Sequence, residues 1–170
     1  MKLRLMGLFL VASIAFVACK KDSADAENSN LRIRMTDAPL DVDAVNIDLQ
    51  SVVVKFDKED SDWLPLTTLP GIYNLLALQN GVDTLIAHGV FPVVRFVKEI
   101  RLIVGSNNTV VVNGQVFPLT IPSGSESGLK IKIDKQLRAP IETLLIDFDA
   151  ALSIKLEPNG YKLRPVVKLK

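Results

Sequence analysis

The stretch FVKEIRLIVGSNNTVVVNGQVFPL, residues 96–119, decides the fold class of this chain. In its first part, apolar Ile100, Leu102 and Val104 alternate with polar side chains, as they do in a half-buried strand. Its second part places Asn113-Gly114 between two apolar runs, which is the strongest short-range signal of a β-hairpin. The stretch therefore predicts a strand followed by a hairpin.

The same period-two alternation runs through most of the chain. We expect strands at 31–36, 45–56, 63–66, 96–104, 109–112, 115–119, 129–134 and 144–157, and a last one after a turn at 158–160. Residues 73–78 and 82–87 fit either a strand or a single helical turn. No long segment shows the period of about 3.6 residues that marks a helix. Many short strands with one polar face each predict an all-β protein, an antiparallel β-sandwich.

One expected strand, from Val45 to Phe56, changes phase along its length. Apolar side chains stand at odd positions in its first half and at even positions in its second half. A one-residue slip would turn every later side chain to the opposite face of the sheet. We therefore expect a β-bulge at Gln50-Ser51.

Residues 1–18 have the pattern of a secretory signal peptide. Lys2 and Arg4 precede an apolar run that is shorter than the ~20 residues needed to span a bilayer. Ala18 directly before Cys19, the single cysteine, resembles the lipobox of bacterial lipoproteins. That resemblance implies cleavage before Cys19, a diacylglycerol on its thiol and an acyl chain on its amine. An ordinary signal peptide or a short membrane anchor is the alternative.

The segment 19–30 holds no large apolar side chain beyond the lipidated Cys19 and predicts a disordered linker. The residue after the cysteine is Lys20, not the Asp that, by resemblance to Gram-negative sorting rules, retains lipoproteins at the inner membrane. We therefore expect a protein anchored by lipid in the outer membrane, on its periplasmic or cell-surface face. A single domain, 31–170, follows the linker.

Composition excludes several function classes. Without Lys2 and Arg4 the 20 basic residues become 18 against 19 acidic ones, a net charge of −1, which gives no field to attract nucleic acid. One cysteine and one histidine, His88, exclude a Cys/His zinc site and a disulfide within the chain. We expect no cofactor, and His88 without partners is a loop residue rather than a catalytic base.

Six motifs resemble one catalogued family. They are Met35-Thr36-Asp37-Ala38-Pro39, Val45-Asn46-Ile47-Asp48, residues 75–81, Ile100-Arg101-Leu102, Ser127-Gly128-Leu129-Lys130 and Asp147-Phe148-Asp149-Ala150. In this order they are similar to the lipoprotein-type family known as domain of unknown function 4382, over essentially residues 31–170. The resemblance implies a β-sandwich of immunoglobulin-like or prealbumin-like type, and it brings no activity.

An acidic cluster contains the candidate metal ligands Asp37, Asp41 and Asp43. Hard cations such as Ca²⁺ take six to eight oxygen ligands, of which this loop could supply some. The alternative is that these side chains bond backbone groups of a turn between strands.

A second acidic pair, Asp147 and Asp149, shares one face of an expected strand, about 6.6 Å apart along the backbone. That spacing would suit a carboxylate pair in a glycosidase. Lys130 and Lys132 have the same spacing on what looks like a neighbouring strand, so a ladder of cross-strand ion pairs is the alternative that we favour.

We expect a lipid-anchored module of the cell envelope that binds a glycan or an envelope protein without catalysis. A structural subunit of an outer-membrane assembly is the alternative, and an envelope hydrolase using Asp147 and Asp149 is a weaker one. Glycan binding predicts an exposed aromatic platform, for which Trp63, Tyr73 and Tyr161 are the candidates.

Overall fold

The computed structural model describes residues 28–38, 40–56, 63–93, 95–122, 128–138, 140–164 and 166–170. The predicted signal peptide, Cys19 and the acidic loop 58–62 lie outside the described residues. Among the residues that are described, no helix has the length and apolar character needed to cross a membrane.

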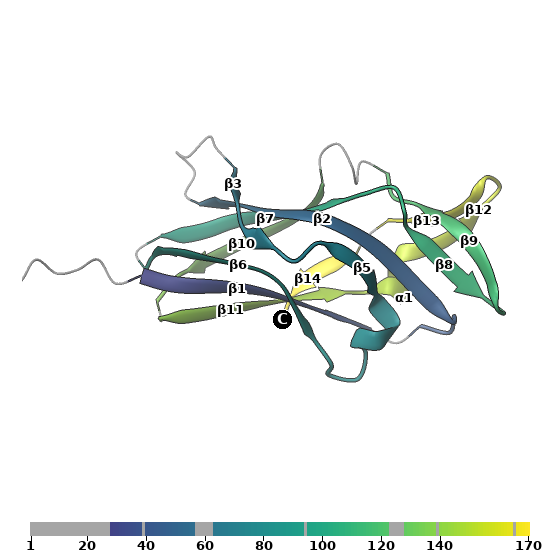
Figure 1. The fold of residues 1–170 in the computed structure, drawn as a ribbon, viewed down its shortest axis with the longest axis horizontal. Helices are drawn as coiled ribbons and strands as arrows, with labels where there is room; N and C mark the ends of the chain where they lie inside the picture. Colours follow the sequence, from purple (N-terminus) through teal and green to yellow (C-terminus); the bar gives the residue numbers. More distant parts are fainter. Residues whose placement is uncertain are drawn as a thin grey trace, which may run out of the picture.

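Two β-sheets pack face to face, which confirms the predicted β-sandwich; β2 and β7 lie in the upper layer of Figure 1, and β1 and β11 in the lower one. The five-stranded sheet has the order β14 (Val167–Leu169), β11 (Ile141–Phe148), β1 (Asn28–Asp37), β6 (Thr84–Pro92) and β4 (Thr67–Thr68). The nine-stranded sheet runs β10 (Leu129–Gln136), β7 (Phe96–Val104), β2 (Ala44–Phe56), β8 (Thr109–Val112), β9 (Gln115–Thr120), β13 (Gly160–Leu163) and β12 (Ile154–Glu157). Two short strands, β3 (Leu64–Pro65) and β5 (Gly71–Asn74), also pair with β2. The 3₁₀ helix η1 (Leu75–Leu78) and the single turn α1 (Ala150–Ser153) are the helical elements among the described residues.

The hydrophobic core fills the space between the sheets. Alternate side chains of the long strands point inward, and those of Ile33, Val54, Ile100 and Phe148 are 0% exposed. Burial of one such side chain contributes about 1.5–3 kcal/mol. The period-two pattern of the sequence therefore becomes one continuous core.

The predicted bulge in β2 is confirmed. Leu49 pairs with Val104 and Ser51 with Ile103, so that Gln50 is the extra residue. The hairpin around Asn113-Gly114 is also confirmed, with φ angles of 51° and 73° that suit a type I′ turn.

β7 and β8 lie one after the other along the same edge of β2. β7 pairs with the second half of β2 and β8 pairs with its first residues, both antiparallel. The chain leaves this edge only over residues 105–108. β2 therefore connects two parts of the nine-stranded sheet that are otherwise separate.

Three expectations about the strands are wrong. The strand expected at 144–157 ends at Phe148, and α1 separates it from β12, because the chain here leaves the five-stranded sheet for the nine-stranded one. β1 begins at Asn28, inside the predicted linker, because pairing with Phe91 of β6 draws Ser29 into the sheet as a buried residue. Pairing is not purely antiparallel either, since β1–β11 and β9–β13 are parallel.

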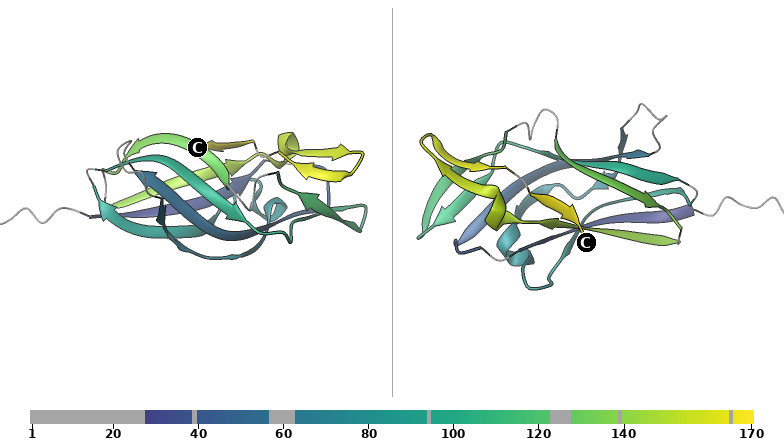
Figure 2. Two further views of the ribbon diagram at one scale, coloured as in Figure 1. Left: turned by 90° about the horizontal axis from the view of Figure 1, so that it is seen from above. Right: turned by 180° about the vertical axis from the view of Figure 1, so that it is seen from behind.

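The molecule has two parts along its long axis. The body holds the sandwich, and the distal extension consists of β8, β9, β12 and β13, which project beyond it on the right of Figure 1. The start of β1 lies at the opposite end, as the view from behind in Figure 2 also shows. The N-terminal side of the domain and the distal extension are therefore at opposite poles.

Candidate functional site

A hollow of about 430 Å³ lies in the distal extension, between β9 and the β12–β13 hairpin. The residues that line it include Phe117, Thr120, Leu156, Glu157, Asn159 and Tyr161. They come from two hairpins that are about forty residues apart in the chain. We call this hollow the distal pocket.

The aromatic wall of the distal pocket follows from two tight turns and one parallel pairing. Gly160, with φ of 111°, lets the chain reverse after β12. β13 then pairs in parallel with β9, with Tyr161 opposite Leu119. This register places the Tyr161 and Phe117 rings with centroids 5.2 Å apart and an interplanar angle of 52°. A tilted pair of this kind gives a firm apolar surface.

Exposed aliphatic side chains occur in both parts of the molecule: Val90 on β6 of the body and Val116 on β9 of the extension are each 62% exposed. Leu156 on β12, which lines the distal pocket, is 71% exposed. Such side chains next to half-buried rings are typical of a binding surface rather than of a core edge.

The charged residue that lines the distal pocket is Glu157, which is ion-paired with Lys162 and Arg164. The Glu157 carboxylate accepts a hydrogen bond from Lys162 Nζ at 2.6 Å and one from Arg164 Nη2 at 3.1 Å. The hydrogen bond from Lys162, with the charges of Lys162 and Arg164, lowers the pKa of Glu157 below its usual value. Glu157 is therefore an ionised acceptor beside the aromatic pair, with the amide of Asn159 nearby.

A second hollow, of about 280 Å³, lies next to the distal pocket and shares Pro118 and Thr120 with it. Asn108, which is 4% exposed, lines this hollow at the point where β7 gives way to β8. Its Oδ1 accepts from Asp48 N at 2.8 Å and its Nδ2 donates to Gly105 O at 2.7 Å. The Asn108 carboxamide thus replaces the missing peptide group of the interrupted strand.

The Asp48 side chain completes this junction. Its Oδ1 accepts from Gln50 and its Oδ2 from Asn107 N at 3.3 Å, while Asp48 O accepts from Gly105 N at 2.7 Å. A Cβ at position 105 would collide with the Asp48 carboxylate. The junction between body and extension is therefore a buried, satisfied polar network, which fixes the angle at which the extension leaves the sandwich.

The expected ion-pair ladder between Lys130, Lys132 and the two aspartates is wrong. The lysines lie on β10 in the nine-stranded sheet, opposite Arg101 and Glu99, while Asp147 lies on β11 in the other sheet. The alternating pattern showed which side chains share a face, but it did not show which strands are neighbours.

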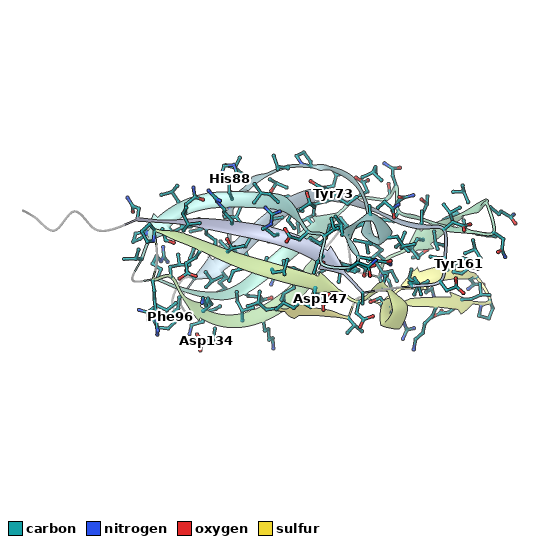
Figure 3. All side chains as sticks on the ribbon, turned by 90° about the horizontal axis from the view of Figure 1, so that it is seen from below. Tyr73, His88, Phe96, Asp134, Asp147 and Tyr161 are labelled. Carbon is teal, nitrogen blue, oxygen red and sulfur yellow. The ribbon has the colours of Figure 1, made fainter. Side chains whose placement is uncertain are left out.

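Asp147 and Asp149 also differ in their surroundings. The Asp147 side chain is 2% exposed and its Oδ2 lies 3.3 Å from Lys170 Nζ, so it is an ion-paired group near the C-terminus. Asp149 is half-buried beyond the end of β11. Neither residue lines either hollow described above. Figure 3 shows Asp147 at mid-length, well away from Tyr161.

The candidate metal ligands bond to backbone groups instead. Asp37 is 4% exposed and its Oδ1 accepts from Ala150 N at 3.0 Å, while Asp43 Oδ2 accepts from Gly114 N at 2.7 Å. Asp41 is exposed. Within the described part of the chain, no three His, Cys, Asp or Glu side chains are placed to hold a metal ion. Asp37 and Asp43 thus bond to backbone groups that are distant in the chain, whereas the alternative expected bonds to nearby backbone of a turn.

The three candidate platform aromatics are all half-buried, at three separate places. Trp63 lies under Arg101, whose guanidinium carbon is 3.6 Å from the ring centroid, and the Tyr73 hydroxyl donates to Leu69 O at 2.6 Å. Only Tyr161 lines a described hollow. His88, which we expected in a loop, lies instead on β6, and in Figure 3 it lies toward the opposite end of the molecule from Tyr161.

Sequence reasoning missed Phe117, Glu157 and Asn159 as site residues. Each turn of the distal pocket was visible as Asn113-Gly114 or Pro158-Asn159-Gly160. The parallel pairing of β9 with β13, which brings these turns together, has no signal in the sequence.

A family model with the description "Domain of unknown function (DUF4382)" matches residues 28–165. The chain therefore belongs to this family, as the motifs indicated. Comparison with curated proteins and with solved structures finds no match.

Proposed function

We propose that this protein is a lipid-anchored binding module of the cell envelope whose distal pocket takes a neutral saccharide unit. The observation that carries the proposal is the Phe117–Tyr161 ring pair beside the Glu157 carboxylate in a hollow of about 430 Å³. Sugar rings offer C–H groups to aromatic faces and hydroxyl donors to carboxylates. Lys162 and Arg164 hold the Glu157 carboxylate in place. A carboxylate has about four lone-pair sites, so Glu157 can still accept hydrogen bonds from sugar hydroxyls.

The position of the distal pocket supports a role away from the membrane. We propose that Cys19 is acylated and sits in the outer membrane, as the lipobox and Lys20 suggest. With β1 starting at Asn28, residues 20–27 form the tether, and eight residues span at most about 26–29 Å. β1, which such a tether would precede, begins at the pole opposite the distal extension. The module would then present its pocket outward, without catalysing a reaction.

Saccharide binding is tested by saturation-transfer NMR of the domain with a panel of neutral gluco-, manno- and galacto-oligosaccharides. We expect at least one to bind, and Tyr161→Ala to abolish that signal. Tyr73→Phe is the matched control, because Tyr73 lies on the body with its hydroxyl bonded to Leu69 O. The proposal fails if no oligosaccharide binds, or if Tyr161→Ala binds as well as the parent protein.

The anchor is tested separately. Cys19→Ser should release the protein from the membrane fraction, and mass spectrometry of the mature parent should show an acylated N-terminal cysteine. An unmodified amino terminus would contradict lipidation and leave saccharide binding untouched.

A subunit role in an envelope assembly is the second candidate. Leu156 is 71% exposed on β12, which is the edge strand of the nine-stranded sheet and is open to a partner strand. A photocrosslinking side chain at position 156 should capture an envelope protein in intact cells if this role holds. The same group at Ile72, which is 55% exposed on β5, is the control.

A further inference from the structure

The outer face of the body part of the nine-stranded sheet carries an excess of positive charge. Two rows of side chains cross β10, β7 and β2: Lys130, Arg101 and Val53 in one, and Lys132, Glu99 and Lys55 in the other. Lys98 joins them from the bulge of β7, where its Nζ lies 2.6 Å from Asp134. The face thus holds five cations and two carboxylates, in a chain whose formal net charge is only +1.

The first row contains a like-charge pair. Lys130 and Arg101 are direct cross-strand partners, and both side chains point outward. Like charges directly opposite one another destabilise a sheet. Lys130 and Lys132 are exposed and form no ion pair among the described residues. An anion bound across this row would relieve the repulsion.

Arg101 is held ready for such an anion. Its guanidinium stacks on the Trp63 ring at 3.6 Å from the centroid, and Glu99 Oε1 lies 3.5 Å from its Nε. The stacked guanidinium is planar and fixed, so less side-chain entropy is lost when it binds an anion. The face therefore combines the stacked guanidinium of Arg101 with the exposed ammonium groups of Lys130 and Lys132 on the neighbouring strand.

We propose that this face binds an anionic polysaccharide that runs across β10 and β7. The charged rows extend over strands spaced about 4.8 Å apart, which suits a repeating chain of charges rather than a compact ligand. A membrane surface fits less well. No large hydrophobic side chain among those more than one-third exposed lies on β7, β10 or residues 51–56, so nothing there would insert between lipids. The inference is independent of the distal pocket.

The test is a binding titration of the full mature chain, so that the acidic run 57–62 is included. The probes are dextran sulfate, polygalacturonate, uncharged dextran and vesicles of phosphatidylglycerol. We expect both charged polysaccharides to bind and uncharged dextran not to bind. Affinity should fall steeply with salt, as expected when bound counterions are released.

Two double variants that remove the same charge distinguish an effect of this face from an effect of the net charge of the protein. Lys130→Gln with Lys132→Gln should weaken binding at least about tenfold. Arg32→Gln with Lys155→Gln removes the same charge from exposed sites on β1 and β12, and should change affinity less than about twofold. Tyr161→Ala should bind normally, which distinguishes this face from the distal pocket.

Three outcomes would overturn the proposal. They are no binding to either charged polysaccharide, equal losses in the two double variants, or tighter binding to the vesicles than to the polysaccharides. Lys130→Glu tests whether a loss of binding is caused by unfolding. It should abolish binding, and the new ion pair with Arg101 should raise the midpoint of urea unfolding.

Discussion

The body and the distal extension are built from the same kind of strand but bury their side chains to very different degrees. In the body, Phe56 and Phe148 are 0% exposed between two sheets. In the extension, Phe117 and Tyr161 are only partly buried: they pack against each other and against the edge of the core, which Leu119 and Leu163 extend into β9 and β13. The difference separates completely buried apolar groups, which stabilise the fold most, from partly exposed ones, which contribute less.

The largest predicted effect tests this separation directly. Phe148→Ala should lower the free energy of unfolding by about 3–5 kcal/mol, because it leaves a cavity in the closed core. Phe117→Ala should lower it by about 1 kcal/mol or less, since this ring is already half-exposed. Urea unfolding of both variants measures the contrast. Equal losses would mean that the Phe117 ring stabilises the fold as much as a fully buried core ring does.

The next effect concerns the junction. Asn108→Ala removes the acceptor for Asp48 N and the donor to Gly105 O, and buried groups left unsatisfied cost about 1–3 kcal/mol. Asn107→Ala is the control, because Asn107 is exposed and bonds Asp48 only through its backbone. Native-state hydrogen exchange should show faster exchange in β8 and β9 of Asn108→Ala. Unchanged exchange there would contradict the role of the junction.

A smaller effect depends on pH and lies at the end of β1 in the body. Burial, with a contribution from the charge of Asp149, raises the pKa of Asp37 above 3.8. The native state then holds this proton more tightly than the unfolded chain, so stability falls as the pH rises from 3.8 through the native pKa. Asp37→Asn keeps an acceptor for Ala150 N and should be more stable than the parent at neutral pH.

Below about pH 3.8 the two proteins should unfold alike, because the carboxyl is then neutral in both states. Urea unfolding across this range checks the sign, with exposed Asp41→Asn as the control. A parent protein that gains stability on raising the pH through this window, relative to Asp37→Asn, would show that the Asp37 charge is stabilised instead.

The smallest effect is on the charged face of the body. Lys130→Gln removes the repulsion with Arg101 and should raise the free energy of unfolding by about 0.2–1 kcal/mol at low salt. The gain should disappear at high salt, where surface charges are screened. A loss of stability instead would mean that Lys130 contributes to packing in the free protein.

Some features of this fold can be predicted from the local pattern of apolar and polar residues, and others cannot. The bulge at Gln50, the strand Phe96–Val104 and the Asn113-Gly114 hairpin all follow from alternation and turn chemistry, and all are present. The alternation of 144–157 is equally regular, yet the strand breaks at α1. An alternation of apolar and polar residues indicates that one face of a segment is buried. It does not indicate which sheet covers that face.

The candidate site shows the same limit. Tyr161 was identified as a platform candidate, but Phe117 and Glu157 were not, because they reach it through the parallel pairing of β9 with β13. The pair Asp147 and Asp149 has the same sequence spacing as the pair Lys130 and Lys132, but Asp147 and Lys130 lie on strands of different sheets.

The sequence by itself determined most of the strands, their inward faces, the turns and the family, because each depends on residues a few positions apart. Only the tertiary structure decided which strands are neighbours, that an aromatic pocket forms at the pole opposite the N-terminal end, and that Lys130 faces Arg101. These depend on contacts between segments distant in the chain, and nothing in a local pattern specifies the partner.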